Sequence, residues 1–130
     1  MRIVIIGGGI GGLAAALALR REGFEPAVYE RAPALLEVGA AIAVWPNAFG
    51  VLERLGLGET LRARAGRIRS ARWLGRDGRE YNHFTFPETG APAVALHRAD
   101  LQGALLRELP PGCDGALYML QGSNCQAIRV

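Results

Sequence analysis

Lysine does not occur in this sequence of 130 residues, so all 15 of the side chains counted as Lys or Arg are arginines. The two residue types differ in geometry and hydration, but no fold needs to avoid one of them everywhere. The absence therefore indicates a compositional bias of the source and carries no functional signal. Aspartate and glutamate number 12, which leaves a formal net charge of +3.

Cysteine is scarce as well. The two cysteines, Cys113 and Cys125, lie near the end of the sequence, and no metal-ligand spacing surrounds them. This usage is typical of a reducing compartment and not of a disulfide scaffold. We therefore expect a cytoplasmic protein without a metal site.

An apolar run suited to a membrane span or a secretory signal is also missing. Residues 3–19 are uncharged, but five of the six positions from 7 to 12 are glycines, and each costs a helix about 1 kcal/mol relative to alanine. Arg20-Arg21-Glu22 then stands where a signal peptide needs small residues. We expect no membrane partner.

Low-complexity tracts and tandem repeats are absent too. Half of the residues (50%) are hydrophobic and 21% are charged, which is a globular composition. The length fits one domain with a sizeable core. Seven arginines fall between Arg62 and Arg79, but from residue 67 to 73 they alternate with apolar residues, as on a half-exposed strand. This stretch lacks a stacking platform and a nucleic-acid module, so we expect a solvated strand face and no nucleic-acid partner.

What the sequence does contain is a glycine-rich turn between two apolar segments. Residues 3–6 (IVII) precede residues 7–12 (GGGIGG), and an Ala/Leu-rich segment and a second short strand follow, ending at Glu30. The glycines at 7, 9 and 12 fit G-x-G-x-x-G, and Glu30 follows Gly12 by 18 residues. Strand, glycine turn, helix, strand and terminal acid together form the dinucleotide-binding fingerprint.

Each part of this fingerprint has a physical role. Gly7 allows a sharp turn, because glycine takes a positive φ without steric cost. Gly9 leaves room for a pyrophosphate, and Gly12 lets the helix lie close to the sheet. The helix N-terminus offers free N–H groups to phosphate. The Glu30 carboxylate can accept hydrogen bonds from a ribose hydroxyl pair and would repel a 2′-phosphate.

The pattern as a whole predicts an α/β fold built on a parallel βαβ unit, with a β-hairpin and further helices. Residues 39–44 are small and could pass close to a bulky planar ligand, or could equally form a tightly packed loop and strand. Asp77-Gly78 is a hairpin signal, and Gly23 is placed to end the first helix. We predict strands at 2–6 (buried), 26–30, 67–74, 79–86, 93–96 and 116–120, and helices at 11–22, 47–55, 58–65 and 100–109.

Three blocks of the sequence resemble one enzyme family. They are GGGIGGLAAALALRREGFEPAVYER, VGAAIAVWPNAFGVLERLGL and LHRADLQGALL, and the resemblance spans residues 1 to about 110. In this order and spacing they are similar to the opening of the FAD-dependent aromatic-ring monooxygenases of the p-hydroxybenzoate and salicylate hydroxylase type. The segment GAAIAVWPN is particularly similar to the corresponding segment of the FAD-dependent urate hydroxylases within that group.

The resemblance implies a set of cofactor-binding residues. Gly7, Gly9, Gly11 and Gly12 would cradle the FAD pyrophosphate, Glu30 would bind the adenosine ribose, and Arg31 would lie near the adenine end. The backbone around Ala43 would follow the flavin side. Arg98 would approach the phosphate and ribityl region, and Gln102 would share that role. Spacing supports the last pair independently, because residues i and i+4 share one helix face. His97 has no partner in the sequence, and we expect it to serve packing.

The family hydroxylates a small aromatic or heteroaromatic ring with O2 and uses NAD(P)H as the reductant. The cofactor carries that chemistry, which agrees with the absence of a nucleophile motif or an acid–base pair, so no catalytic residue is assigned. Two later family motifs do not occur here. We therefore expect residues 1–112 to be the N-terminal part of an FAD-binding domain and residues 113–130 an atypical tail, truncated or frameshifted. The short chain is expected to be inactive alone.

Two alternatives stay open at this point. One is a fragment of a Rossmann oxidoreductase that uses NAD, and the other is a non-catalytic fragment for nucleotide binding or interaction. The substrate, the choice between NADH and NADPH and the oligomeric state are not determined by the sequence, because fold alone does not decide chemistry.

Overall fold

The structure, a computed structural model, describes residues 3–32, 40–109, 117–121 and 124–128. Its first element group is the predicted parallel unit of β1 (Ile3–Ile6), α1 (Ile10–Arg21) and β2 (Pro26–Glu30). β1 and β2 pair in parallel, with Ile3 opposite Pro26 and Ile6 opposite Tyr29. The α/β fold class is thereby confirmed.

Two strands near the end of the chain extend this sheet. β8 (Leu117–Gln121) pairs in parallel with β2, and β9 (Asn124–Ile128) pairs antiparallel with β8, which gives the order β1-β2-β8-β9. The strand predicted at 116–120 corresponds to β8. β9 was not predicted, because residues 124–128 alternate too weakly to indicate a strand.

The first helix ends as its glycine predicts. Gly23 has a φ of +83°, and its N–H donates to the Arg20 carbonyl at 3.0 Å. The Phe24 N–H donates to the Leu19 carbonyl, also at 3.0 Å. Together these bonds form a Schellman motif, which satisfies carbonyls that the helix end leaves free and turns the chain back toward β2.

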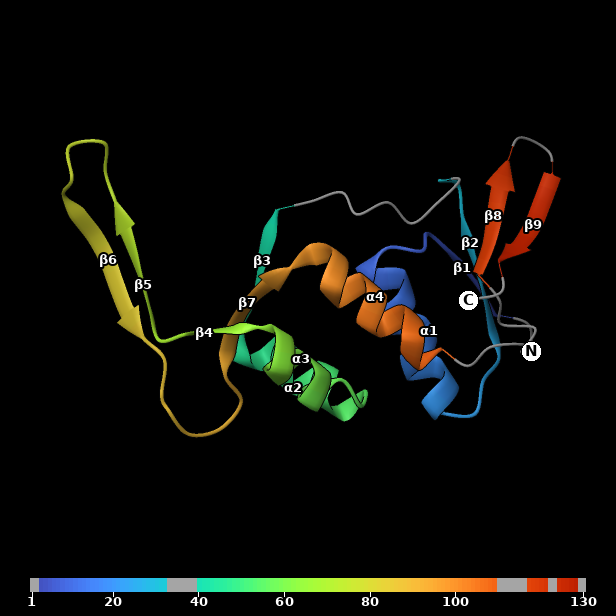
Figure 1. The fold of residues 1–130 in the computed structure, drawn as a ribbon, viewed down its shortest axis with the longest axis horizontal. Coiled ribbons are helices and arrows are strands. Elements are labelled where there is room, and N and C mark those ends of the chain that lie inside the picture. The colour runs from blue at the N-terminus through green and yellow to red at the C-terminus, as the bar shows by residue number, and fades with distance from the viewer. Residues whose placement is uncertain (1–2, 33–39, 110–116, 122–123, 129–130) are drawn as a thin grey trace.

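A second layer packs against α1. It contains a three-stranded antiparallel sheet in the order β3-β7-β4 and three helices. The strands are β3 (Ala41–Val44), β4 (Gly66–Ile68) and β7 (Ala93–His97), and the helices are α2 (Pro46–Arg54), α3 (Gly58–Arg64) and α4 (Arg98–Glu108). In Figure 1, α4 lies alongside α1 and links the two layers.

The core lies between these helices and β7. Its largest fully buried side chains come from all four helices and from the residue before α3, and are Leu13, Phe49, Leu57, Leu61, Leu101 and Leu105. Leu101 and Leu105 are one helical turn apart on α4, so one face of that helix is buried, as the i, i+4 rule predicts. Burying one such side chain fully is worth about 1.5–3 kcal/mol.

The single strand predicted at 67–74 is wrong. The chain changes partner within two residues there, since Ile68 of β4 pairs with Ala93 of β7 whereas Ser70 of β5 (Ser70–Leu74) pairs with Thr85. Arg69 lies at the break, and its carbonyl accepts a hydrogen bond from the Phe86 N–H at 2.8 Å. Local sequence does not encode this change of sheet.

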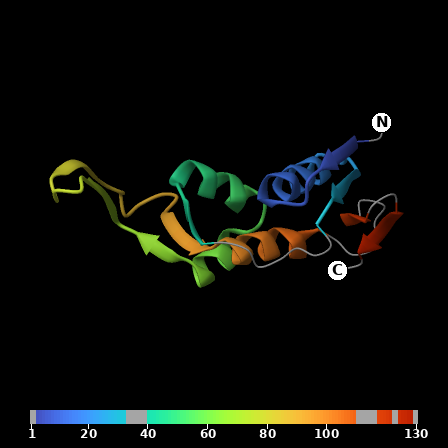
Figure 2. The same ribbon diagram turned by 90° about the horizontal axis from the view of Figure 1, so that it is seen from above.

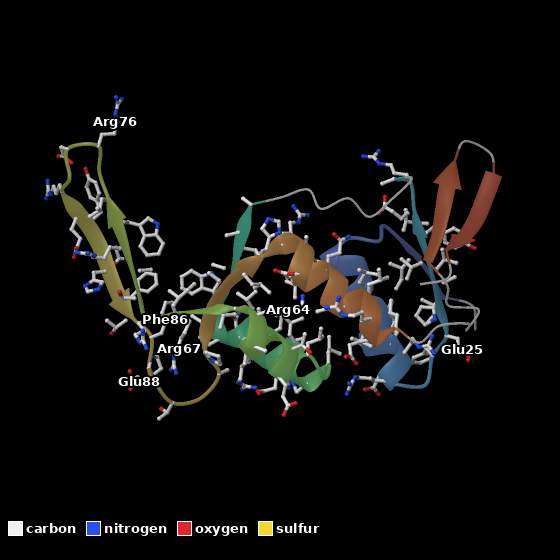
Figure 3. The ribbon with its side chains drawn as sticks, viewed as in Figure 1. Glu25, Arg64, Arg67, Arg76, Phe86 and Glu88 are labelled. Carbon is white, nitrogen blue, oxygen red and sulfur yellow. The ribbon has the colours of Figure 1, made fainter. Side chains whose placement is uncertain are left out.

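β5 forms the predicted hairpin with β6 (Glu80–Thr85). Gly78 in its turn has a φ of +79°, as Asp77-Gly78 predicts. The hairpin projects from the body of the molecule, at the left of Figure 1. Figure 3 shows Arg76 at its tip, directed away from the body.

An aromatic cluster joins the hairpin to the body. Trp45, which precedes α2, has its ring centroid 5.7 Å from that of Phe84 and 5.1 Å from that of Phe86. Arg67 donates to the carbonyl oxygens of Pro87 and Glu88 at 3.2 and 2.7 Å, beside Phe86 in Figure 3. The hairpin is thus held at its base and free at its tip.

We expect Trp45→Ala to loosen the hairpin, because each aromatic pair contributes about 0.5–1.5 kcal/mol. Loss of both Trp45 pairs should speed tryptic cleavage at the hairpin arginines about tenfold, since about 1.4 kcal/mol corresponds to a factor of ten. Trp73→Ala is the matched control, because Trp73 contacts Phe84 within the hairpin at 4.7 Å. Equal cleavage rates in the two variants would contradict the anchoring role.

The prediction that the first strand is buried is wrong for alternate residues. Val4 and Ile6 are 48% and 77% exposed, whereas Ile3 and Ile5 are half-buried. α1 covers only the face on which Ile5 lies. Gly39, the first residue of the small-residue segment 39–44, lies outside the described residues.

Candidate dinucleotide site

The glycine turn adopts a conformation that only glycine favours. Gly7 follows β1 directly and has a φ of +109°, and its N–H donates to the Tyr29 carbonyl at 2.6 Å. Gly12 lies against Gly7, since a Cβ built on Gly12 would be 1.9 Å from the Gly7 carbonyl oxygen. Positions 7 and 12 are therefore fixed by the fold itself, independently of any ligand.

Gly9 and Gly11 differ from these two, because a Cβ at either position would meet no heavy atom within 4 Å. Gly9 precedes α1 as its N-cap without a side-chain hydrogen bond, and the first turn of α1 carries no acidic residue. The positive end of the helix dipole therefore faces open space. This is the geometry of an anion site at a helix N-terminus.

Glu30 is joined to the glycine turn by a hydrogen bond. Its Oε2 accepts from the Gly8 N–H at 2.7 Å, and its Oε1 accepts from the Ala32 N–H at 2.9 Å. These N–H groups, Ala32 first and Gly8 second, lower the pKa of the Glu30 carboxyl below its ordinary value of 4.5. The group is an anion at neutral pH, and each of its oxygens keeps a lone pair for a further donor.

Helix α4 reaches the same turn from the other layer. The Gln102 side-chain amide donates to the Gly8 carbonyl at 3.0 Å, across 94 positions of sequence. Arg98 is exposed at the start of α4 and lines an open cavity of about 380 Å³ together with Ile10, Ala40, Ala41 and Ile42. The structure thus brings Gln102 to the glycine turn, and Arg98 lies on the wall of the adjoining cavity.

Three other residues from the sequence analysis have different surroundings. Ala43 is exposed on β3 and is not among the cavity-lining residues, although Ala40 to Ile42 are. Arg31 is exposed directly after β2. His97 does not serve packing as expected: it is exposed, and its Nδ1 accepts from the Ala99 N–H at 3.4 Å as the N-cap of α4.

Gly8 is a residue of the candidate site that was not predicted from the sequence. Its N–H contacts Glu30 and its carbonyl contacts Gln102, so both of its backbone groups tie the site together. A glycine in an x position of G-x-G-x-x-G carries no side-chain signal that would reveal this. Ile10, another x position, also lines the cavity, and only its apolar character was available as a signal.

Within the described residues, no group of three His, Cys, Asp or Glu side chains is placed to hold a metal ion. The same part of the chain has no helix that is long and apolar enough to cross a membrane.

We expect Glu30→Gln to change how stability depends on pH. Because the folded pKa of Glu30 is depressed, its carboxylate stabilises the fold above pH 4.5, and that contribution is lost as the pH falls through the depressed pKa. The variant should lose about 1 kcal/mol at pH 7, the usual net value of a hydrogen bond, and less below pH 4. Urea unfolding between pH 3 and 7 measures this. The exposed Glu25, labelled in Figure 3, provides the control Glu25→Gln with the same charge change; parallel pH curves for the two variants would contradict the role of Glu30.

These features define a Rossmann-like dinucleotide-binding unit. In agreement, residues 5–43 match the family described as the NAD(P)-binding Rossmann-like domain. That range contains the glycine turn, Glu30 and all of the cavity-lining residues except Arg98. NAD and FAD share an ADP half, so the match concerns the part of the site that both cofactors use.

Flavin enzymes are similar to a larger part of the chain than this family match covers. The chain is 44% identical over 119 residues to a 3-amino-4-hydroxybenzoate 2-monooxygenase of Streptomyces platensis, covering 85% of this chain and 30% of the relative. It is 36% identical over 111 residues to an FAD-dependent urate hydroxylase of Klebsiella pneumoniae, covering 82% of this chain and 29% of the relative. The solved structure of Klebsiella pneumoniae HpxO complexed with FAD and uric acid superposes with a TM-score of 0.67 at 33% identity, covering 85% of this chain and 29% of that one.

The chain is therefore similar, over most of its length, to an N-terminal portion of the FAD-dependent aromatic-ring monooxygenases. It spans about 30% of the length of the curated relatives it matches. The family resemblance predicted from the three sequence blocks is confirmed.

Proposed function

We propose that this chain binds FAD and forms the N-terminal part of the cofactor site of a flavin-dependent monooxygenase. The observation that carries the proposal is the pair of hydrogen bonds at Gly8, which bring Glu30 and Gln102 to one turn at 2.7 and 3.0 Å. The pyrophosphate would lie over Gly9 and Gly11 at the helix N-terminus, with the ribose hydroxyls at Glu30 and the adenine end near Arg31.

The cavity beside the turn supports FAD over a smaller nucleotide. Arg98 supplies a cation on one wall, and the small residues Ala40 and Ala41 form another. A guanidinium is suited to phosphate, because its planar donors match phosphate oxygens. The volume of about 380 Å³ is within the range of small-molecule sites. The backbone near Ala43 would follow the flavin side as the resemblance implies.

When bound, FAD supplies the redox chemistry of such enzymes. The residues of this chain contribute binding and orientation: helix α1 and Arg98 neutralise phosphate charge, and Glu30 holds the ribose. NAD(P)H as the reductant and a small aromatic or heteroaromatic ring as the substrate belong to the same proposal, supported by the names of the relatives. We assign residues 1–112 to the FAD-binding part and residues 113–130 to an atypical tail, in a cytoplasmic protein that is inactive as this chain alone.

Identification of the co-purifying cofactor tests the proposal. We expect a yellow protein that releases FAD on denaturation, as measured by chromatography against FAD and FMN standards. NADPH-dependent oxygen consumption with hydroxybenzoates or urate should stay at background. A colourless chain that binds added NAD and not FAD would favour the NAD-dependent alternative, which the NAD(P)-binding match to residues 5–43 supports.

A further inference from the structure

Helix α4 carries the two side chains that it contributes to the candidate site within its first two turns. Arg98 is its first residue, and Gln102 follows one turn later and donates to the glycine turn at 3.0 Å. The Arg98 N–H donates to the Ala40 carbonyl at 3.4 Å. The Ala99 N–H donates to Nδ1 of His97, also at 3.4 Å. Hydrogen bonds of backbone N–H groups are usually about 2.9–3.0 Å long, so the start of α4 is held weakly.

The residue that caps this helix can lose its acceptor. Nδ1 of His97 accepts a hydrogen bond only while the ring is neutral and carries its proton on Nε2, because both nitrogens of an imidazolium are donors. The side-chain oxygens of the usual N-cap residues stay acceptors near neutral pH, whereas histidine ordinarily changes charge roughly between pH 5 and 8. Protonation of His97 therefore removes the cap and places a positive charge at the positive end of the helix dipole, directly before Arg98.

The charged groups nearest to this cap are an arginine and an ion pair. Arg98 and Asp100 lie in the first turn of α4, and Arg64 of α3 pairs with Asp100 at 3.3 Å. Strand β3, which pairs with His97 through Ala41, carries no charged residue. Helix α1, which packs against α4, is charged only in its last turn. Histidine is thus the side-chain type at this end whose charge ordinarily changes near neutral pH.

Charged groups farther from the cap have contacts of their own. Glu53 of α2 pairs with Arg62 of α3, and Arg67 of β4 donates to backbone carbonyls of the loop after β6. The other charged side chains of α2 and α3 are exposed and are Arg54 and Glu59. Within the candidate site, Glu30 stays an anion as the pH falls toward 5, because the backbone N–H groups that donate to it lower the pKa of its carboxyl below 4.5.

We propose that His97 is a positioning residue that makes FAD binding depend on pH. In its neutral form it caps α4 and holds Arg98 and Gln102 at the glycine turn and the adjoining cavity, and in its protonated form it releases the first turn of the helix. Release lowers the fraction of molecules that are competent to bind, which raises the apparent Kd in proportion. Removal of an N-cap shifts a helix equilibrium about fivefold, so FAD should bind about fivefold more weakly at pH 5.5 than at pH 8. The effect on FAD rests on the proposed function, whereas the cap itself does not.

Fluorescence titration with FAD at pH 5.5 and pH 8 tests the proposal, because the chain has two histidines and each can be replaced singly. His97→Asn keeps an acceptor at the N-cap without a titrating ring, and it should bind FAD at both pH values within about twofold. His83→Asn is the matched control, since His83 is exposed on β6. Figure 2 shows the yellow hairpin that contains β6 at the left end of the molecule, away from the orange helix α4. This variant should keep the change of about fivefold.

Two results of this titration would overturn the proposal. One is a pH effect that persists in His97→Asn. The other is FAD binding that becomes tighter at pH 5.5 and loses this change in His97→Asn, since that result would assign the protonated ring to a direct phosphate contact.

Solvent exchange of the Ala99 amide, measured by NMR without FAD, separates this proposal from the proposed function. Its protection factor, which corrects for the intrinsic effect of pH on exchange, should fall about fivefold from pH 8 to pH 5.5 in the unsubstituted chain and in His83→Asn. The protection factor should not change in His97→Asn. Protection that is independent of pH in the unsubstituted chain would overturn the proposal, whether or not FAD binds. If the protection changes as expected and FAD binds at neither pH, the cap is upheld and the FAD assignment is the part that fails.

Discussion

Gly9→Val is expected to weaken FAD binding at least a hundredfold while leaving the free energy of unfolding within about 0.5 kcal/mol of the unsubstituted chain. Gly9 has a φ of −74° and a ψ of −179°, an extended conformation that valine adopts readily. A Cβ there meets no heavy atom within 4 Å. It would instead fill the space at the helix N-terminus that we assign to the pyrophosphate. A hundredfold loss corresponds to about 2.7 kcal/mol.

Fluorescence titration with FAD and urea unfolding together measure the two halves of this result. Gly50→Val is the matched control, because a Cβ at Gly50 in α2 also meets nothing within 4 Å and Gly50 is outside the candidate site. It should leave FAD affinity unchanged. Equal FAD affinity in Gly9→Val and the unsubstituted chain would show that the pyrophosphate does not lie at this turn.

Gly12→Ala is expected to destabilise the fold itself, by about 3 kcal/mol or more. The added Cβ would be 1.9 Å from the Gly7 carbonyl oxygen and 3.0 Å from the Gly7 carbonyl carbon. Both are backbone atoms held by the pairing of β1 and β2, so no side-chain rotation relieves the contact. Either α1 moves away from the sheet or the turn changes shape, and overpacking of this kind typically costs 1–3 kcal/mol and occasionally more.

The neighbouring glycine supplies the opposite expectation. Gly11 lies in the same helix turn, and a Cβ there meets nothing within 4 Å. Gly11→Ala should therefore stabilise the chain by up to about 1 kcal/mol, the difference in helix propensity. Urea unfolding of the two variants compares them directly. The same effect in both, whatever its sign, would contradict the close contact between Gly12 and Gly7.

The parts of the fold that the sequence predicted are those encoded locally. The glycine turn, the Gly23 helix end and the Asp77-Gly78 hairpin turn each depend on a positive φ that glycine alone supplies cheaply. The position of Glu30 at the end of β2 follows from spacing. Neighbouring residues in the sequence determine these features, which do not depend on what packs against them.

The parts that were not predicted depend on distant partners. The chain changes sheets at Arg69 because β4 pairs with β7, about 25 residues later in the sequence, and β5 pairs with β6. The exposure of Ile6 depends on what covers the sheet, and the role of His97 as an N-cap depends on where α4 begins. In the candidate site, the contact of Gln102 with Gly8 spans 94 positions of sequence. Only the common helix face and role of Gln102 and Arg98 were predictable, from the i, i+4 spacing and the family resemblance.

Equilibrium titration of the purified chain with FAD, ADP and NAD tests the central claim most directly. If the site holds the ADP half at the glycine turn and the rest of FAD along the cavity beside Arg98, then FAD binds at least tenfold more tightly than ADP or NAD. Arg98→Ala then reduces that preference, and Glu30→Ala weakens all three ligands together. Equal affinity for FAD and ADP that Arg98→Ala does not change, or FAD affinity insensitive to Glu30→Ala, would contradict the account.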